Sequence, residues 1–170
     1  MRESGVIITI PEVEPLVGTI RNAHDRVARL GVPAHITLLY PWYTPPIDDD
    51  ALTRLRAAIE RFEPYPLIFR GIGRFERALY LRPDDDGQTL DLMARICAAF
   101  PAHPPYGGQF TQQVPHLTVA EADGSLEPLI TTFAPSLLAG LPIKTSVSAV
   151  TVMESGDDGR WSTRAVIPFR

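Results

Sequence analysis

Cysteine, long apolar runs and surplus positive charge are all scarce in this chain of 170 residues. A single cysteine, Cys97, excludes a disulfide within the chain. The longest apolar stretches, such as 6–8 and 137–139, fall far short of the roughly 20 residues that a membrane-spanning helix needs. The apolar run after Ser4 is also too short for a signal-peptide core. We therefore expect a cytoplasmic protein with no membrane partner.

The charge balance argues against a protein that grips a long nucleic acid. The chain has 16 Lys and Arg against 20 Asp and Glu, a net charge of -4 and a sequence pI near 5.5. Proteins that bind a nucleic-acid backbone usually carry a basic face. We expect a small ligand and no extended nucleic-acid-binding face, although a local basic groove is compatible with this balance. A composition of 45% hydrophobic and 21% charged residues also excludes a disordered or fibrous protein.

A short motif occurs twice, at 32–38 (VPAHITL) and at 114–119 (VPHLTV), with its two histidines 81 residues apart. The elements expected around each copy follow one order: helix, histidine-bearing strand, helix, strand, strand, with one extra strand in front. We therefore predict a single domain over 1–170, made of two pseudo-repeated lobes at about 1–84 and 85–170. Each lobe is expected to be a small antiparallel sheet covered outside by helices, which gives a bilobal α+β fold around a central cleft.

Apolar periodicity and the Pro/Gly turns place the individual elements. Strands are expected at 6–10, 35–40, 67–69, 78–81, 114–120, 143–153 and 161–169. Helices are expected at 13–20, 52–62, 90–100 and 126–137.

The strongest chemical signal is a His-x-Thr pair on each repeated strand. Because strand side chains alternate between faces, His35 and Thr37 point the same way, as do His116 and Thr118. The apolar residue between each pair points into the core. A polar pair on an otherwise apolar strand is costly to bury unless another polar group meets it. Two such strands related by a pseudo-twofold axis would bring both pairs to one cleft.

Two imidazoles with two hydroxyls suit chemistry at a phosphodiester. Displacement at phosphorus needs a base on the attacking oxygen and an acid on the leaving oxygen. A histidine pKa of about 6.5 allows one ring to be neutral and the other protonated at cellular pH. Threonine hydroxyls can donate to the non-bridging oxygens, where charge develops. This chemistry needs no metal or other cofactor, because a protonated imidazole supplies both a charge and a proton.

Other interpretations of the motif remain open. A lone His-x-Thr is usually structural, with the imidazole bonded to a backbone carbonyl and threonine present because it favours strands. Four His and 13 Thr in 170 residues give about 0.3 such matches by chance, and the chain has two. A non-catalytic module that holds a nucleotide or RNA end in the same cleft is the alternative function. Zinc held through His35 and His116 is disfavoured, because neither has a further ligand at suitable spacing.

These motifs resemble the paired His-x-(Ser/Thr)-apolar motifs of the two-histidine (2H) phosphoesterase superfamily. Segments 32–41, 115–120 and 69–81 are most similar to its bacterial branch, the 2′–5′ RNA ligase-like or cyclic phosphodiesterase proteins. The resemblance implies a bilobal α+β fold with a central cleft and a metal-independent phosphoesterase activity. The substrates it implies are 2′,3′-cyclic nucleotide or RNA ends, ADP-ribose cyclic phosphate, or 2′–5′ linkages.

The resemblance also implies roles for four residues of this chain. His35 and His116 would form the acid and base pair, and Thr37 and Thr118 would hold the phosphate. The partner would be a small nucleotide or an RNA-end phosphate.

Arginines and aromatic residues near the expected cleft are weaker candidates. Most are expected to lie on the surface or in the core, although one or two arginines of each hairpin could reach a phosphate and an aromatic ring could stack on a base. The arginines are 70, 74, 77, 82, 160, 164 and 170, and the aromatic residues are Tyr40, Trp42, Tyr43, Phe75, Tyr106 and Trp161.

Overall fold

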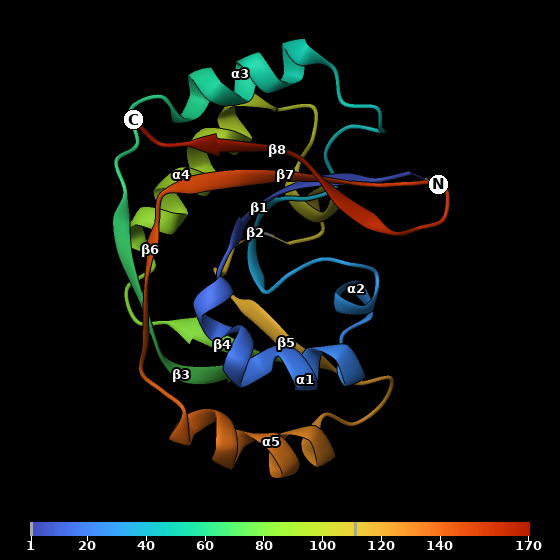
Figure 1. Ribbon diagram of the computed structural model, residues 1–170, viewed down its shortest axis with the longest axis vertical. Helices are drawn as coiled ribbons and strands as arrows, with labels where there is room; N and C mark the ends of the chain where they lie inside the picture. The colour runs from blue at the N-terminus through green and yellow to red at the C-terminus, as the bar shows by residue number, and fades with distance from the viewer. Residues whose placement is uncertain (1, 111) are drawn as a thin grey trace.

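The computed structural model describes residues 2–110 and 112–170 and contains two four-stranded antiparallel sheets (Figure 1). The first sheet has the strand order β2-β1-β7-β8 and the second has the order β5-β4-β3-β6. This arrangement confirms the predicted α+β class. The strands are β1 (Ser4–Thr9), β2 (His35–Leu39), β3 (Tyr65–Arg74), β4 (Ala78–Pro83), β5 (Leu117–Glu121), β6 (Ile143–Val147), β7 (Ala149–Ser155) and β8 (Trp161–Pro168).

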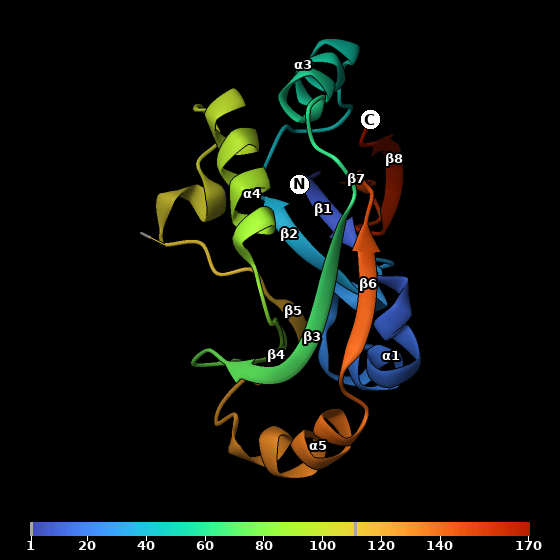
Figure 2. The ribbon, with the colours of Figure 1, turned by 90° about the vertical axis from the view of Figure 1, so that its left-hand side faces the viewer.

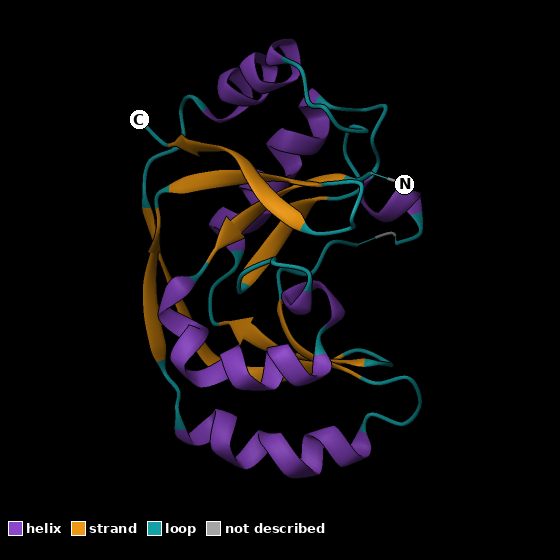
Figure 3. Cartoon of the chain, turned by 45° about the vertical axis from the view of Figure 1, so that its right-hand side comes forward, coloured by secondary structure: helices purple, strands orange, loops and turns teal. Residues whose placement is uncertain are grey.

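Helices lie on the outside of the two sheets (Figure 3). Local signals fix where they start: Asp48 accepts a hydrogen bond of 2.7 Å from the Ala51 amide at the start of α3, and a proline occupies the first turn of α1 and of α5. The helices are α1 (Glu14–His24), α2 (Arg26–Arg29), α3 (Asp49–Ile59), α4 (Gly87–Ala99) and α5 (Glu127–Ala139), with short 3-10 turns η1 (Pro11–Val13) and η2 (Pro105–Gly108).

Each sheet takes strands from both halves of the chain. Strands β1 and β2 pair with β7 and β8 in one sheet, while β3 and β4 pair with β5 and β6 in the other. The helices also cross over, because α1 contacts β5 and α4 contacts β2. The expected lobes at about 1–84 and 85–170 therefore do not correspond to the two sheets, although residue 84 does lie in the turn between β4 and α4.

One strand prediction is wrong, and the difference shows how the chain passes from one sheet to the other. The segment 143–153 forms parts of two strands instead of one strand, with Ser148 between them. β6 pairs with β3 in one sheet, and β7 pairs with β1 in the other. Figure 2 shows β6 running beside β3 and then leading up to β7. The pattern of apolar and polar residues along one segment does not reveal that the chain changes its partner strand midway.

The two histidine-bearing strands are edge strands of different sheets, and they lie next to each other. β2 ends one sheet, β5 ends the other, and the two strands are in contact. β5 begins at Leu117, so His116 directly precedes the strand instead of lying within it. The predicted alternation holds, because Ile36 and Leu117 are fully buried.

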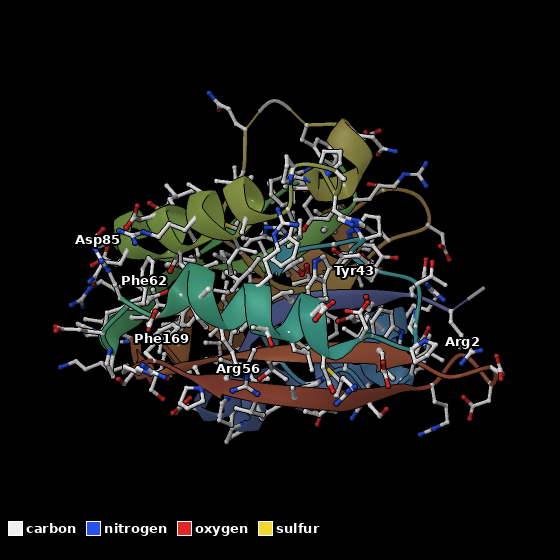
Figure 4. All side chains as sticks on the ribbon, turned by 90° about the horizontal axis from the view of Figure 1, so that it is seen from above. Arg2, Tyr43, Arg56, Phe62, Asp85 and Phe169 are labelled. Atoms are coloured by element: carbon white, nitrogen blue, oxygen red, sulfur yellow. The ribbon has the colours of Figure 1, made fainter. Side chains whose placement is uncertain are left out.

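A single large hydrophobic cluster spans both sheets and their helices. It includes Val6 of β1, Phe69 of β3 and Leu79 of β4 together with Ile36 and Leu117. Away from the histidine strands, Phe62 after α3 packs on Phe169 after β8 with ring centroids 5.8 Å apart, at one end of the molecule seen from above (Figure 4). The shared core joins the two histidine strands rigidly. Over the described ranges 2–110 and 112–170, no helix is long and apolar enough to cross a membrane.

Candidate active site

The four residues of the two His-x-Thr motifs line one cavity. His35 and Thr37 reach it from β2, and His116 and Thr118 reach it from the start of β5. Its volume is about 300 Å³. The structure thus brings together all four residues that the sequence placed in a common cleft.

Both imidazoles are held by the same type of hydrogen bond. Nδ1 of His35 lies 2.8 Å from the carbonyl oxygen of Pro33, and Nδ1 of His116 lies 2.6 Å from the carbonyl oxygen of Val114. A carbonyl only accepts, so Nδ1 carries the proton in both rings. In the neutral rings Nε2 is therefore the free acceptor, and it is the nitrogen available to a bound molecule.

Burial lowers the pKa of both histidines. Loss of hydration brings the pKa of His35 down to about 4, with Arg21 and His116 adding repulsion, while the Pro33 carbonyl and Asp25 act in the opposite direction. Burial also lowers the pKa of His116, against the effect of its bond to Val114. The repulsion by which His116 lowers the pKa of His35 agrees with the position of both rings in one cavity. Before an anion binds, both rings are neutral at neutral pH.

A buried ion pair supports the segment that leads into β2. The Arg21 guanidinium donates to the Asp25 carboxylate at 2.8 Å, and both side chains are almost fully buried. Arg21 also donates to the Val32 carbonyl at 3.3 Å, and Glu14 accepts from the Ala34 amide at 2.6 Å. These bonds fix the backbone that positions the carbonyl partner of His35.

His116 packs against two aromatic rings of the β3–β4 hairpin. The Phe75 ring meets it edge-on at 4.8 Å between centroids, and the Tyr80 ring lies at 5.4 Å. Both contacts restrict the orientation of the imidazole. Phe75 is one of the exposed large apolar side chains of the protein.

Tyr106, one of the six aromatic residues named from the sequence, lines both cavities. It lies in η2, and its φ of 51° is unusual for a residue other than glycine. Its amide donates to the Tyr40 carbonyl at 2.6 Å, and its side chain lines the smaller cavity together with Thr37. Burial raises the pKa of Tyr106, so it stays a neutral hydrogen-bonding group. The signal available was an aromatic residue followed by two glycines in a Pro-rich loop.

A second, larger cavity of about 900 Å³ adjoins the first. It shares four residues with the smaller one: Tyr106, His116, Thr118 and Glu121. Its remaining walls include apolar side chains from three separate segments: Phe75, Met93, Phe110 and Val114. A molecule with its phosphate at the histidines therefore has an apolar space beside it on the His116 side.

Most of the arginines named from the sequence form ion pairs with carboxylates and line neither cavity. Arg77 lines the larger cavity, while Arg26 of α2, which sequence reasoning missed, lines the smaller one. The other hairpin arginines with surface partners are Arg70 with Asp84 at 2.8 Å, Arg74 with Glu127 at 2.6 Å, Arg164 with Asp49 at 3.5 Å and Arg170 with Glu60 at 2.8 Å. Of the aromatic residues named, Tyr40, Tyr106 and Trp161 line the smaller cavity.

No group of three His, Cys, Asp or Glu side chains is placed to hold a metal ion in the part of the chain that the structure describes. The cavity around the histidines is lined by hydroxyls, aromatic rings, aliphatic side chains and the charged residues Glu3, Asp25, Arg26 and Glu121.

Comparison with solved structures shows the same fold at low sequence identity. E. coli LigT crystallised with NADP+ superposes with a TM-score of 0.59 at 15% identity, covering 99% of this chain and 97% of that chain. The structure of E. coli LigT with 3′-AMP matches equally, at 0.59 and 15%, covering 99% of this chain and 98% of that chain. The protein TT0787 of Thermus thermophilus matches with a TM-score of 0.59 at 18% identity, covering 99% of this chain and 97% of that chain.

Sequence comparison supplies the family. No curated protein matches the chain. The sequence profile of the 2′-5′ RNA ligase superfamily matches residues 10–159, which include both His-x-Thr motifs. On this match and the LigT-like fold, the chain belongs to the 2′-5′ RNA ligase superfamily of two-histidine phosphoesterases.

Proposed function

We propose that the protein is a metal-independent phosphodiesterase that acts on a 2′,3′-cyclic or 2′-linked ribonucleotide phosphate. His35 and His116 are its general acid and base, and Thr37 and Thr118 hold the phosphate. The observation that carries this proposal is the pair of imidazoles that line one cavity, each with Nδ1 fixed by a carbonyl and Nε2 left for the substrate.

Hydrolysis of a cyclic phosphate uses each of these groups once. The base histidine takes a proton from water as the water oxygen attacks phosphorus. The bond between phosphorus and one ribose oxygen breaks, and that oxygen takes a proton from the other histidine. The hydroxyls of Thr37 and Thr118 donate to the non-bridging oxygens. The product is a nucleoside 2′- or 3′-monophosphate.

The pKa values favour His35 as the base. A histidine with a pKa of about 4 is neutral at pH 7, with Nε2 ready to accept a proton. The phosphate anion raises the pKa of any imidazole beside it, so His116 gains its proton when the substrate binds. The roles exchange in the reverse reaction, in which the freed ribose hydroxyl attacks phosphorus and water leaves.

The larger cavity suits the nucleoside portion of such a substrate. It opens directly from the His116 side of the phosphate site, and Phe75, Tyr106 and Phe110 offer aromatic faces there. Nucleotides occupy the crystals of LigT, a protein of the same fold, as the NADP+ and 3′-AMP complexes show. The substrate class that we propose is a nucleotide with its phosphate at the histidines.

The test is a screen of nucleoside 2′,3′-cyclic phosphates and 2′–5′ dinucleotides with a chelator present. We expect turnover of at least one of them, and a loss of about 10²–10⁴-fold in kcat/KM for His35→Ala and for His116→Ala. His24→Ala is the matched control, because His24 lies on α1 and lines neither cavity. Turnover that disappears with the chelator and returns with a divalent ion would contradict the proposal.

One observation favours the alternative of a non-catalytic module that binds a nucleotide or RNA end. Before a ligand binds, both imidazoles are neutral, so two acceptors and no acid face the incoming molecule. Such a module would bind 3′-AMP in calorimetry but turn over none of the screened compounds, and His116→Ala would weaken its binding only a few-fold.

A further inference from the structure

Glu121 stands where the two cavities meet. It is the last residue of β5, three positions after Thr118 in the second motif, and it lines the smaller and the larger cavity alike. A molecule that holds its phosphate at the histidines and extends into the larger cavity therefore comes near this carboxylate.

The surroundings of Glu121 are already negative. Burial raises its pKa, and Asp25 and Asp123 raise it further, while Arg26 is the one cation that acts against them among the described residues. The shift shows that a negative charge is disfavoured at this junction. A second anionic group of a ligand would meet the same penalty.

The other charged residues of the smaller cavity do not offset the negative surroundings of Glu121. Asp25 is paired with Arg21 at 2.8 Å, and Glu3 accepts a hydrogen bond of 3.0 Å from the Tyr40 hydroxyl. Arg26 is the sole Lys or Arg among the described residues that line this cavity. One cation can match one phosphate charge. It leaves none for a second phosphate group.

The larger cavity is no better suited to an anion. It carries the carboxylates of Glu76, Glu121 and Asp123 against the guanidinium of Arg77, and much of its remaining wall is apolar. A group that is neutral and rich in hydrogen-bond donors fits this wall, because a carboxylate accepts from hydroxyl and amino groups.

We infer that Glu121 determines which substrates the site accepts: it admits a nucleoside with one phosphate at the histidines and rejects a nucleoside with a further phosphate group on the His116 side. This inference rests on the proposed function, which gives the kind of substrate. It adds that the substrate carries no second phosphate group on the His116 side. The Glu121 carboxylate accepts from a sugar hydroxyl or a base amino group of the accepted substrate. It repels the added phosphate of the rejected one.

Binding of two probes tests the inference without any need for turnover. Adenosine 3′-monophosphate and adenosine 3′,5′-bisphosphate differ only in the 5′-phosphate, and calorimetry gives both Kd values. We expect the wild-type protein to bind the monophosphate at least about tenfold more tightly. Glu121→Gln keeps the size of the side chain and removes its charge, so the preference should fall by about tenfold.

Two further measurements separate this effect from a general change of charge or stability. Glu63→Gln makes the same charge change on an exposed loop residue that lines neither cavity, and it should keep the wild-type preference. In the wild-type protein, the preference should shrink as salt rises from about 0.05 to about 0.5 M, because screening weakens the repulsion. Equal Kd values for the two probes, or a preference unchanged in Glu121→Gln, would overturn the inference.

The inference and the proposed function fail in different ways. Turnover of adenosine 2′,3′-cyclic phosphate with no discrimination between the two probes would overturn the role of Glu121 and leave the phosphodiesterase intact. Discrimination between the probes with no turnover would support the role of Glu121 and contradict the phosphodiesterase.

Discussion

His35 and His116 have matching surroundings although they come from different sheets. Each ring gives its Nδ1 proton to a carbonyl two residues earlier in the chain, over 2.8 Å and 2.6 Å. Each is followed by an apolar residue that is fully buried and then by a threonine that lines the cavity. This local unit fixes the ring orientation and leaves one nitrogen and one hydroxyl for the substrate. Two such units around one cavity are the arrangement on which the proposed acid and base pair rests.

The threonine hydroxyls are expected to act on the transition state. Thr118→Val keeps the shape of the side chain and removes the donor. We expect a loss of about 2–4 kcal/mol of transition-state stabilisation, which lowers kcat/KM by roughly 30- to 1000-fold. Thr118→Ser should restore most of the activity. Thr53→Val, at an exposed position on α3, is the control and should leave kcat/KM unchanged. A Thr118→Val variant with wild-type kcat/KM would show that the hydroxyl takes no part.

The lowered pKa of His35 makes stability depend on pH. Because its pKa falls from 6.5 to about 4 on folding, the unfolded chain binds more protons between these values. The free energy of unfolding therefore falls as pH drops from 6.5 to 4, by on the order of 2 kcal/mol once the partial exposure of the ring is allowed for.

His35→Gln should flatten this dependence, and urea unfolding at about pH 7, 5.5 and 4.5 measures it. The control is His24→Gln on α1, which should keep the wild-type slope. An equal slope in His35→Gln and in the wild type would mean that another group causes the acid sensitivity.

At the scale of single residues, the sequence was sufficient for the motif but not for its neighbours. His35, Thr37, His116 and Thr118 were predictable because strand alternation and repetition act over a few residues. Tyr106 and Arg26 reach the cavity from a 3-10 turn and a four-residue helix, which have no periodicity to read. Their approach depends on how distant segments pack.

At the scale of secondary-structure elements, α1 supports the catalytic strand through a buried ion pair. Arg21→Met would leave the Asp25 carboxylate buried without its partner, so we expect a loss of about 3–5 kcal/mol in the free energy of unfolding. The double variant Arg21→Met with Asp25→Leu should recover most of that loss, because no uncompensated charge remains.

Urea unfolding of the single and double variants measures this. Arg56→Met on α3, at an exposed position, is the control and should change the free energy of unfolding by less than about 0.5 kcal/mol. A single variant as stable as the wild type would show that the pair contributes nothing to the fold.

The predicted elements were accurate where periodicity and turn residues agreed. The helices at 52–62, 90–100 and 126–137 correspond to α3, α4 and α5 within a few residues. The segment 143–153 was misjudged because β6 and β7 follow each other almost directly, and only their pairing with β3 and β1 separates them. Partner choice between strands is a long-range property that no local pattern contains.

At the scale of the whole molecule, the exchange of strands makes the two halves depend on each other. Fragment 1–84 contains β1 and β3 without their partners β7 and β6, and fragment 85–170 has the converse defect. We expect each fragment alone to lack a cooperative thermal transition in circular dichroism, because its sheets have unpaired edges and a divided core. A 1:1 mixture should recover native-like structure if the fragments associate. A fragment that folds cooperatively on its own would contradict this account of the architecture.

The same exchange creates the site. The two histidine strands, each at the edge of its own sheet, are in contact, and they belong to one core in which α1 packs on β5 and α4 packs on β2. The repetition in the sequence predicted a shared cleft, while the route by which the strands reach it required the structure.

The central claim is that the two imidazoles act as one acid and base pair on a single phosphate. The most direct measurement is the pH profile of kcat/KM for a nucleoside 2′,3′-cyclic phosphate, with a chelator present, in the wild type, His35→Ala and His116→Ala. The account predicts a bell for the wild type, loss of the acidic limb in His35→Ala and loss of the basic limb in His116→Ala, each at strongly reduced rate. A residual profile that keeps both limbs in either variant would contradict it.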